Sequence, residues 1–383
     1  MKILYDHQIF SYQKLGGASR YFYELMNEFS NIEEIDFHLA IFYSDNEYLK
    51  NAAFMKCRDL MKNIQFNERI RLFKIFFIYL INKWISKKLI CKENYDIFHP
   101  TFYDPYFYPL TKPFVLTILD MIPENFPDMF SSRCLYSRFI TNKWIKAKKI
   151  LAQKASKIIA ISEHTKKDII KFYGIDEKKI DVIHLGNSLK QSNTVISHTI
   201  KLPDKYVLFV GARSRYKNFD NFIKAMEKIL KNYKKLNIVC TGGGKFTSEE
   251  IKLFIKLGIN DRIHQYSVND DILGIIYKHA IALVFPSLYE GFGLPVIEAF
   301  SCGCPVVLNN SSCFPEIAGD GAIYFDGNDI ESIQNIIEKV LYDEALREEL
   351  ICKGRERAKV FTWENTGRKT LSLYKNTVKQ GRV

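Results

Sequence analysis

Short runs of apolar residues alternate with stretches of helical periodicity along almost the whole chain. The runs have the length of buried strands, and the stretches between them place apolar residues at three- and four-residue spacing. Strands that alternate with helices in this way form parallel sheets covered by helices on both faces. The pattern therefore predicts an α/β protein built from doubly wound, Rossmann-like layers.

The predicted strands fall into two sets, separated by a polar stretch at residues 187–204 that is typical of a linker between domains. A chain of 383 residues is also too long for one ordinary core. We expect an N-terminal domain over residues 1–190, a C-terminal domain over 200–362, and a last helical segment, 363–383, that the sequence assigns to neither. The first set is Ile3–Tyr5, Phe37–Phe42, Asp96–Phe98, Phe114–Leu119 and Lys157–Ile161, and the second is Tyr206–Val210, Asn237–Cys240, Arg262–Tyr266, Ile281–Phe285, Pro305–Leu308 and Ala322–Phe325.

The stretch SLYEGFGLPVIEAF follows one of these strands and combines glycines with two carboxylates, Glu290 and Glu298. Pro295 suits the first turn of a helix, so the glycines lie in a strand-to-helix turn whose amides can receive an anion. The carboxylates suit neutral hydroxyls, which donate hydrogen bonds to them. A diphosphate with sugar hydroxyls at both ends, as in a nucleotide sugar, satisfies both parts of the motif. The alternative is a turn that only redirects the chain, with an acid at the positive end of a helix.

A diphosphate beside two carboxylates requires cations, and the same half of the chain supplies them. The strand Tyr206–Val210 leads into VGARSRYKNF, where Arg213 and Lys217 precede a helix. In the first half, Gly16 and Gly17 also open a helix, although they lack the spacing of a dinucleotide fingerprint. Each feature alone is compatible with a solvent-exposed loop, and together they favour an anionic ligand.

These segments, with DHQIFSYQKLGGASRYFYEL and SLYEGFGLPVIEAFSCGCPVV, resemble the retaining glycosyltransferases of family 4, of the type that builds bacterial surface polysaccharides. The resemblance covers nearly the whole chain. It implies the GT-B fold, two Rossmann-like domains facing across a cleft, with the acceptor bound by the first and the nucleotide sugar mainly by the second. It also implies metal-independent transfer of a hexose, with mannose expected before glucose, galactose or N-acetylhexosamine. No cofactor is expected beyond the UDP- or GDP-sugar substrate.

The resemblance assigns roles to individual residues. Glu290 would meet the donor sugar, Glu298 would hold the ribose hydroxyls, and Val268 falls where relatives often contact the base. The expected donor site consists of Gly16, Gly17, Arg213, Lys217, Val268, Glu290, Gly291, Phe292, Gly293, Leu294 and Glu298.

The sequence departs from the family at one position in the first domain. Many relatives carry a histidine where VLTILDMIPENF places Leu119, beside Asp120. The candidate catalytic residues are therefore Glu290, Asp120 and His99, and a structural role is the alternative for His99 and for His7. The same departure gives a second hypothesis for the whole protein: a nucleotide-sugar-binding protein with little or no activity.

Composition narrows the partners. The 55 basic and 43 acidic side chains give a net charge of +12, which favours an anionic partner. No nucleic-acid-reading motif is present, so nucleic acid is not expected as a partner. The cysteines and histidines lack metal-ligand spacing, and we expect no metal site and a reducing, cytoplasmic location. We expect a glycan or a lipid-linked glycan as the acceptor.

One segment, Arg69 to Lys92, is rich in lysine, arginine and aromatic residues and contains no acid. Its uncharged middle is too short to span a bilayer. A helix of this composition suits the interface of an anionic membrane, such as the inner membrane face. The alternative is a core helix whose apolar face packs under the first sheet with its lysines outside.

Overall fold

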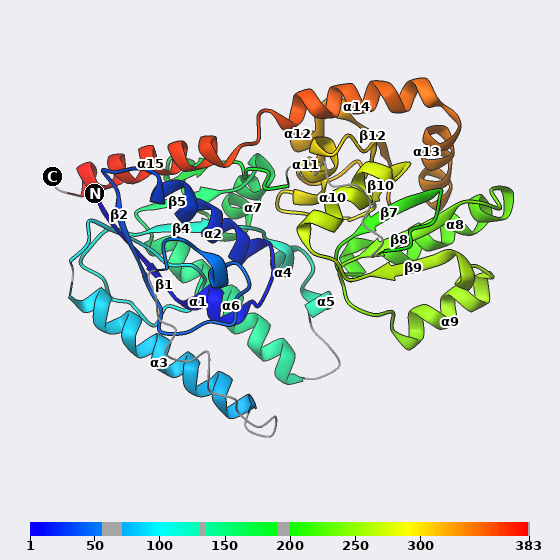
Figure 1. Cartoon of the computed structure of the whole chain (residues 1–383). Coiled ribbons are helices and arrows are strands. Elements are labelled where there is room, and N and C mark those ends of the chain that lie inside the picture. The colour runs from blue at the N-terminus through cyan, green and yellow to red at the C-terminus, as the bar shows by residue number, and fades with distance from the viewer. Residues whose placement is uncertain (56–70, 93, 131–134, 190–199, 214, 382–383) are drawn as a thin grey trace. The chain divides into compact units, whose positions relative to one another are not determined.

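The computed structural model describes residues 1–55, 71–92, 94–130, 135–189, 200–213 and 215–381 (Figure 1). These residues form two compact units: unit 1 is Met1–Leu185 with Trp363–Val383, and unit 2 is Gly186–Thr362. Most of the predicted linker, residues 190–199, and the first residue of the basic segment, Arg69, lie outside the described residues. The segment that the sequence left unassigned, 363–383, belongs to unit 1.

Unit 1 is a layer of parallel strands with helices on its faces. The strands pair in the orders β2-β1-β3 and β4-β5-β6, and a parallel bridge between Phe98 and Phe114 connects the two rows. They are β1 (Lys2–Asp6), β2 (Asp36–Ala40), β3 (Ile97–His99), β4 (Val115–Ile118), β5 (Lys157–Ala160) and β6 (Ile180–Val182). The helices are α1 (Gln8–Tyr12), α2 (Gly17–Ser30), α3 (Arg71–Cys91), α4 (Ile122–Asn125), α5 (Pro127–Phe130), α6 (Leu135–Lys154), α7 (Glu163–Tyr173) and α15 (Trp363–Gln380).

Helix α15 returns the end of the chain to unit 1 and packs along α2 (Figure 1). Its Tyr374 is fully buried and lies 3.2 Å, hydroxyl to hydroxyl, from Tyr5 of β1. The Tyr374 hydroxyl also forms a hydrogen bond with Nδ1 of His99. These buried contacts fasten the last helix to the strands of unit 1.

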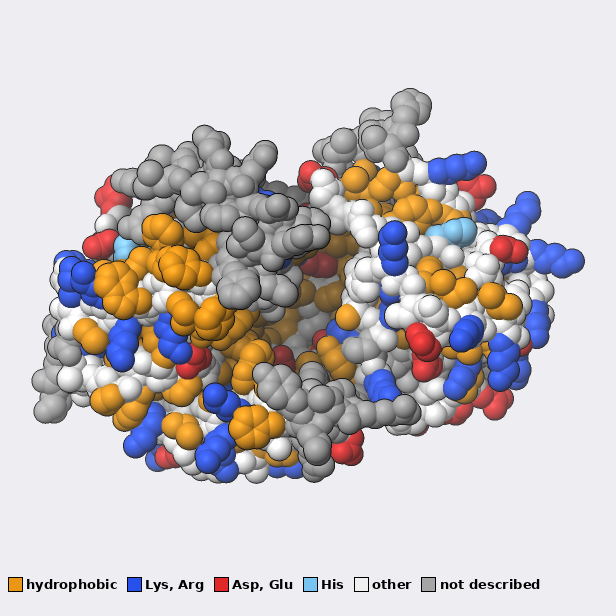
Figure 2. All heavy atoms as spheres, turned by 90° about the horizontal axis from the view of Figure 1, so that it is seen from below, with side chains coloured by type: hydrophobic (Ala, Val, Ile, Leu, Met, Phe, Trp, Pro, Cys, Tyr) orange, Lys and Arg blue, Asp and Glu red, His pale blue; other side chains and the backbone are white. Residues whose placement is uncertain are grey.

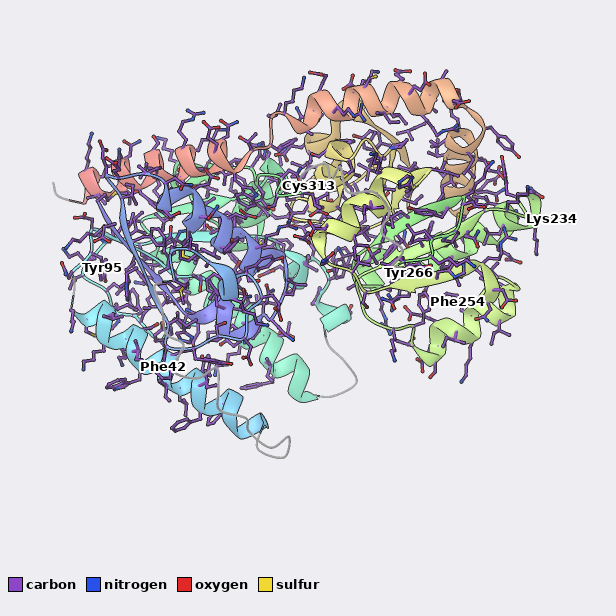
Figure 3. All side chains as sticks on the ribbon, in the orientation of Figure 1. Phe42, Tyr95, Lys234, Phe254, Tyr266 and Cys313 are labelled. Atoms are coloured by element: carbon purple, nitrogen blue, oxygen red, sulfur yellow. The ribbon has the colours of Figure 1, made fainter. Side chains whose placement is uncertain are left out.

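Unit 2 is a second, continuous parallel sheet in the order β12-β11-β10-β7-β8-β9. Its strands are β7 (Tyr206–Val210), β8 (Asn237–Thr241), β9 (Ile263–Tyr266), β10 (Ala282–Phe285), β11 (Val306–Asn309) and β12 (Ala322–Phe325). The helices are α8 (Phe219–Asn232), α9 (Ser248–Leu257), α10 (Asp270–His279), α11 (Leu294–Ser301), α12 (Phe314–Ala318), α13 (Ile330–Tyr342) and α14 (Glu344–Ala358). In Figure 3, Tyr266 marks the end of β9 and Phe254 marks α9.

The core of unit 2 follows from the amphipathic pattern of α8. Phe222, Ile223 and Met226 turn inward against Phe209 of β7, and Phe254 of α9 closes the same cluster. Helix α13 packs against α8, and α14 packs against α11, so helices cover the sheet on both faces. The α/β, two-domain architecture predicted from the pattern is confirmed.

Each strand predicted from the sequence is present, with ends that differ by a residue or two. Strand β6 was not predicted. It is only three residues long, Ile180–Val182, and its burial pattern gives no clear alternation. A short edge strand of this kind carries too little apolar signal to be distinguished from a loop.

Candidate functional site

The strand order of unit 2 reverses between β10 and β7. Strands β7, β8 and β9 run outward on one side of this point, and β10, β11 and β12 run outward on the other. In open parallel sheets such a reversal separates the loops at the carboxyl ends of the two central strands and leaves room for a ligand. The loop after β7 carries Lys217, and the loop after β10 carries Glu290. The fold therefore brings the two best motifs of the sequence to one place.

Lys217 and Glu290 form an ion pair at this point. Nζ of Lys217 lies 2.5 Å from Oε1 of Glu290, and each side chain is 12% exposed. Nζ also lies 5.1 Å from the ring centre of Phe285, at the end of β10. The ammonium and the carboxylate thus neutralise each other in a largely water-excluded position, where a charge interacts more strongly than it does in bulk water.

Backbone contacts hold the two loops together. The amide of Leu288 donates to the carbonyl of Tyr216 over 2.8 Å, which joins the loop after β10 to the loop after β7. The amide of Glu290 donates to Oγ of Ser312 over 3.1 Å. Ser312 itself has φ +51°, a left-handed conformation that is uncommon outside glycine. The backbone of Glu290 is therefore fixed from the loop after β11.

Hydrogen bonds from two asparagines, Asn218 and Asn309, connect the same loops. Nδ2 of Asn309, at the end of β11, donates to the carbonyl of Ser287, and its Oδ1 accepts from the amide of Gly327. Asn218, beside Lys217, donates to the carbonyl of Gly327 over 2.7 Å. Amide side chains are suited to this task because each can donate and accept at once. The loops after β7, β10, β11 and β12 are consequently one connected structure.

Helix α11 begins at Leu294, directly after the glycine turn. Gly293 is its N-cap with φ +87°, and Pro295 lies in the first turn as the sequence predicts. Phe292 is buried and packs edge-on against Phe361 at 5.6 Å between ring centres. The turn Gly291–Gly293 thus places the positive end of α11 beside Glu290, an arrangement that can bind a phosphate group.

Glu298 lies one turn into α11 and is buried, with 5% of the residue exposed. Its Oε2 accepts a hydrogen bond of 3.0 Å from the hydroxyl of Tyr277, on α10. Val268 lies between β9 and α10 and is half-buried. Asn269, the next residue, caps α10 through a 3.1 Å bond to the amide of Ile272.

Arg213 is placed differently from Lys217. Its side chain is 3% exposed, and its Nε donates to Oε1 of Glu250 over 2.7 Å. The rest of the guanidinium donates to backbone carbonyls of the loop after β8, at Gly242, Gly243, Gly244 and Lys245, over 2.9 to 3.3 Å. The guanidinium also lies over the ring of Phe246. Its role toward a diphosphate remains a prediction, and in the structure it holds the glycine loop.

In unit 1, Gly16 and Gly17 lie at the start of α2 as the sequence predicts. The side chain of Gln13 accepts a 3.0 Å hydrogen bond from the amide of Ser19 in the first turn. Its Oε1 would lie 2.7 Å from a Cβ added at Gly16. A neutral amide oxygen thus occupies part of the position that an anion would take at this helix N-terminus.

His99 and His7 are fully buried in unit 1. Nε2 of His99 lies 2.9 Å from Oγ1 of Thr117, and Nδ1 bonds Tyr374, so both ring nitrogens are engaged within the unit. Burial lowers the pKa of His99 to about 3. The catalytic role of His99 remains a prediction, and its contacts are those of a side chain that fastens α15.

Leu119 and Asp120 follow β4 and are half-buried. Oδ1 of Asp120 accepts from the amide of Ile122, which starts α4. The carbonyl of Asp120 accepts from Nζ of Lys148, and Lys148 forms a buried 2.9 Å ion pair with Glu124. The loop that carries Asp120, a candidate catalytic residue, is therefore anchored on a buried ion pair.

Sequence reasoning did not find Tyr277, Ser312 or Glu250. Tyr277 sits on the apolar face of an amphipathic helix, where a tyrosine is usually part of the core. The Ser312 hydroxyl accepts from the amide of Glu290 in another loop, which no sequence spacing indicates, and Glu250 belongs to a capping box with Thr247. The capping box is readable from T-x-x-E, and its second role toward Arg213 is not.

Among the described residues, no group of His, Cys, Asp and Glu side chains could hold a metal ion. Within the same residues, none of the helices combines the length and the apolar character needed to cross a bilayer.

Comparison with known proteins gives consistent matches. Residues 15–191 match the family model "Glycosyltransferase Family 4", and residues 190–357 match "Glycosyl transferases group 1". The O-antigen chain mannosyltransferase RfbU of Salmonella typhimurium is 31% identical over 67% of this chain and 66% of its own length. The O-antigen chain mannosyltransferase B of Escherichia coli is 26% identical over 98% of this chain and 100% of its own length.

Solved structures agree on the fold. HepE of Anabaena, solved with UDP and glucose, has a TM-score of 0.72 at 17% identity over 97% of this chain and 99% of its own. WaaG, a glycosyltransferase involved in lipopolysaccharide biosynthesis, has a TM-score of 0.69 at 16% identity over 98% and 99% of the two chains. The GT-B fold expected from the sequence is therefore confirmed. From the two adjoining family matches, which together run from residue 15 to residue 357, the chain belongs to the glycosyltransferases of family 4.

Proposed function

We propose that this glycosyltransferase moves a mannosyl residue from a nucleotide-diphosphate sugar to a glycan or lipid-linked glycan, with retention at the anomeric carbon and without a metal ion. The two O-antigen mannosyltransferases matched over most of the chain support the sugar and the type of product. The observation that carries the proposal is the Lys217–Glu290 ion pair at the strand-order reversal of unit 2.

The ion pair suits the charge changes of glycosyl transfer. As the bond between the anomeric carbon and the phosphate oxygen breaks, negative charge grows on the diphosphate, and Lys217 is the cation that would receive it. Glu290, released from Lys217, would accept hydrogen bonds from sugar hydroxyls. The acceptor oxygen attacks from the same face, and its proton passes to the departing phosphate oxygen. On this proposal the protein stabilises charge and positions the reactants, and it provides no nucleophile.

Substitution of Glu290 tests the assignment. Purified Glu290→Ala and Glu290→Gln variants would be assayed with GDP-mannose and other nucleotide sugars on an oligosaccharide acceptor panel. We expect kcat to fall by roughly a hundredfold or more, as for the loss of one preorganised transition-state contact. Glu331→Ala, which removes an exposed carboxylate from α13, is the matched control and should keep wild-type rates. Undiminished transfer by both Glu290 variants would refute the site.

A second candidate function rests on Leu119 and the buried histidines. Many relatives are expected to carry an imidazole at the position of Leu119. His7 and His99 are both fully buried, so neither of them supplies an exposed imidazole in its place. A protein that binds nucleotide sugar and does not transfer it is the alternative. Calorimetry that shows donor binding with no transfer on the whole panel would favour it. A gain of transfer in Leu119→His would then identify the missing group.

We also propose that the protein works at the cytoplasmic face of an anionic inner membrane, which it contacts through α3. The side chains described on this helix are arranged opposite to those of a core helix. Asn82 and Ser86 are fully buried, while Phe76, Phe77 and Trp84 are more than half exposed, at 62%, 64% and 63%. Figure 2, seen from below Figure 1, shows hydrophobic side chains among Lys and Arg on this side of unit 1.

The polar face of α3 explains this orientation. Nδ2 of Asn82 donates to Oγ of Ser11 and to the carbonyl of Tyr43, and its Oδ1 accepts from the amides of Phe42 and Tyr43. Oγ of Ser86 donates to the carbonyl of Ala40. These bonds attach the helix to β2 by its polar side, and Figure 3 shows Phe42 beside it. The aromatic side is left for an apolar partner with negative charge nearby, because Lys87 and Lys88 flank Trp84.

Vesicle binding tests the membrane contact. Phe77→Ser and Trp84→Ser should each weaken binding to phosphatidylglycerol vesicles roughly tenfold, because each removes a ring that would be buried in the interface. Tyr342→Ser is the control, since Tyr342 is an aromatic of unit 2 that is 69% exposed. Binding that is equal in all variants would remove the proposal, and binding to neutral vesicles alone would remove its electrostatic part.

A further inference from the structure

Tyr277 and Glu298 form a buried polar pair that connects two helices of unit 2. The hydroxyl of Tyr277 donates to Oε2 of Glu298 over 3.0 Å, and Tyr277 is fully buried while Glu298 is 5% exposed. Tyr277 lies near the end of α10, and Glu298 lies in the middle of α11. A hydrogen bond to a charged acceptor in such surroundings is stronger than one between neutral groups.

The direction of this hydrogen bond is fixed. Burial and the neighbouring Glu298 carboxylate raise the pKa of Tyr277 well above its usual range. The phenol therefore keeps its proton at neutral pH and acts as the donor. A carboxylate can rotate about the bond to its own side chain, and a donor held by a buried ring restricts that rotation.

We propose that Tyr277 is a positioning residue, which sets the plane of the Glu298 carboxylate so that it accepts hydrogen bonds from the ribose hydroxyls of the donor nucleotide. This inference rests on the proposed function and on the ribose contact assigned to Glu298. Removing the phenol hydroxyl would leave a buried carboxylate with one donor fewer and a wider range of orientations. The ribose would then lose affinity although no atom that touches it has changed.

The place of Tyr277 in the chain gives the pair a second connection. Helix α10 starts at Asp270, two residues after Val268, the residue expected to contact the base, and it ends at His279, three residues before β10 begins at Ala282. The expected base contact therefore lies just before the start of this short helix, and the partner of the ribose carboxylate lies near its end. Asn269, the residue between Val268 and the helix, caps α10 by accepting from the amide of Ile272.

The test compares two nucleotides in two proteins. Dissociation constants of GDP and of 2′,3′-dideoxy-GDP would be measured by calorimetry for the wild type and for Tyr277→Phe, and for UDP and its dideoxy analogue in parallel. For the ribonucleotide that the wild type binds, we expect the constant of Tyr277→Phe to rise roughly tenfold, the value of one hydrogen bond to a charged group. For the dideoxy analogue it should change less than twofold. In transfer assays the donor KM should rise while kcat stays within twofold, because the ribose contact is equal in the ground and transition states.

Tyr206→Phe is the matched control. It also removes one buried tyrosine hydroxyl from unit 2, the one that donates to the carbonyl of Ile276 over 2.7 Å. It should lower stability and leave the ratio of the two dissociation constants unchanged. In a Glu298→Ala background, Tyr277→Phe should have no further effect on GDP binding.

The outcomes separate the two levels of inference. A rise that is equal for ribose and dideoxyribose, or no rise at all, overturns the positioning role of Tyr277 while leaving the proposed function intact. A wild-type protein that binds neither nucleotide pair refutes the proposed function and this inference together.

Discussion

The carboxyl ends of the strands are built differently in the two units. In unit 2 they lead into glycine turns and long charged side chains, with Lys217 paired to Glu290 and Arg213 clamped to the loop after β8. In unit 1 the ends of β1 and β3 carry fully buried polar side chains, Asp6 and His99. Asp6 at the end of β1 accepts from both the amide and the hydroxyl of Thr101. His99 at the end of β3 is bonded on both ring nitrogens.

This difference between the two units indicates which polar residues can interact with a ligand. A buried polar group must find a partner inside the protein: Asp6 finds it in Thr101, and His99 finds its partners in Thr117 and Tyr374. Asp6 and His99 therefore stabilise unit 1 through these internal hydrogen bonds. In unit 2 the charged groups lie in loops at a strand-order reversal, where they remain partly accessible and a ligand can exchange for the internal partner. The contrast predicts that changes to Lys217 and Glu290 alter recognition, and that changes to the buried strand-end residues of unit 1 alter stability.

The largest expected effect concerns the crowded glycine loop of unit 2. Gly243 has φ +67°, and a Cβ there would lie 2.9 Å from Nη1 of Arg213 and 3.0 Å from the carbonyl oxygen of Gly211. Gly243→Ala combines a left-handed conformation with a steric clash and should destabilise unit 2 by roughly 3 kcal/mol. Unit 2 contains no tryptophan, so amide hydrogen exchange of β7 and β8 is the suitable measurement.

Gly244 provides the internal control for this prediction. It has φ +73° with nothing within 4 Å of an added Cβ. Gly244→Ala should therefore cost only the conformational part, about 1 kcal/mol. Equal losses at the two positions would show that the close approach of the loop to Arg213 and Gly211 is unimportant.

The next effect concerns acid sensitivity in unit 1. Burial lowers the pKa of His99 to about 3, below the usual value of 6.5. As the pH falls below 6.5 the unfolded chain binds a proton that the folded chain refuses, so stability is lost progressively down to the folded pKa. At pH 5 the loss due to His99 is about 2 kcal/mol. Trp84, Trp144 and Trp363 all belong to unit 1, so their fluorescence reports the unfolding of that unit.

His99→Gln should remove this contribution. The difference in unfolding free energy between pH 7 and pH 5 should shrink by about 2 kcal/mol relative to the wild type. His38→Gln, which changes an exposed histidine of β2, is the control and should leave the pH dependence unaltered. A wild-type acid slope in His99→Gln would mean that His99 is not held neutral in the folded unit 1.

The sequence predicts the architecture well because strand length and helix periodicity are local properties. Every predicted strand is found, and the Lys217 and Glu290 motifs meet because the carboxyl ends of parallel strands share one edge. The pairing of Tyr277 with Glu298 could not be predicted. It depends on how α10 and α11 pack across each other, which no spacing within either helix determines.

Helix α3 is an element whose existence could be predicted from the sequence and whose orientation could not. Its composition predicts a helix, and the structure has one from Arg71 to Cys91. The composition does not determine which face turns inward, because aromatic residues are also typical of a core. Asn82 reverses this, since its side chain bonds three different residues around β2 and α1 and fixes the polar face against the sheet. A single buried amide thus decides which surface the helix presents.

The smallest expected effect decides whether the cations of unit 2 act on a ligand directly or through the backbone. The sequence assigns both Arg213 and Lys217 to the diphosphate, whereas the contacts place the Arg213 guanidinium on Glu250 and the glycine loop. Arg213→Lys should weaken the binding of GDP and of guanosine equally, by about 1 kcal/mol. A lysine cannot donate to several carbonyls at once, so the glycine loop becomes less well held. Lys217→Met is the comparison, and it should weaken GDP alone, since guanosine has no phosphate for the ammonium to meet. If Arg213→Lys also weakened GDP alone, the guanidinium would have to leave Glu250 when the nucleotide arrives. Arg213 would then exchange Glu250 for the diphosphate on binding. In the absence of nucleotide, the capping box would position Glu250 so that it holds the Arg213 side chain.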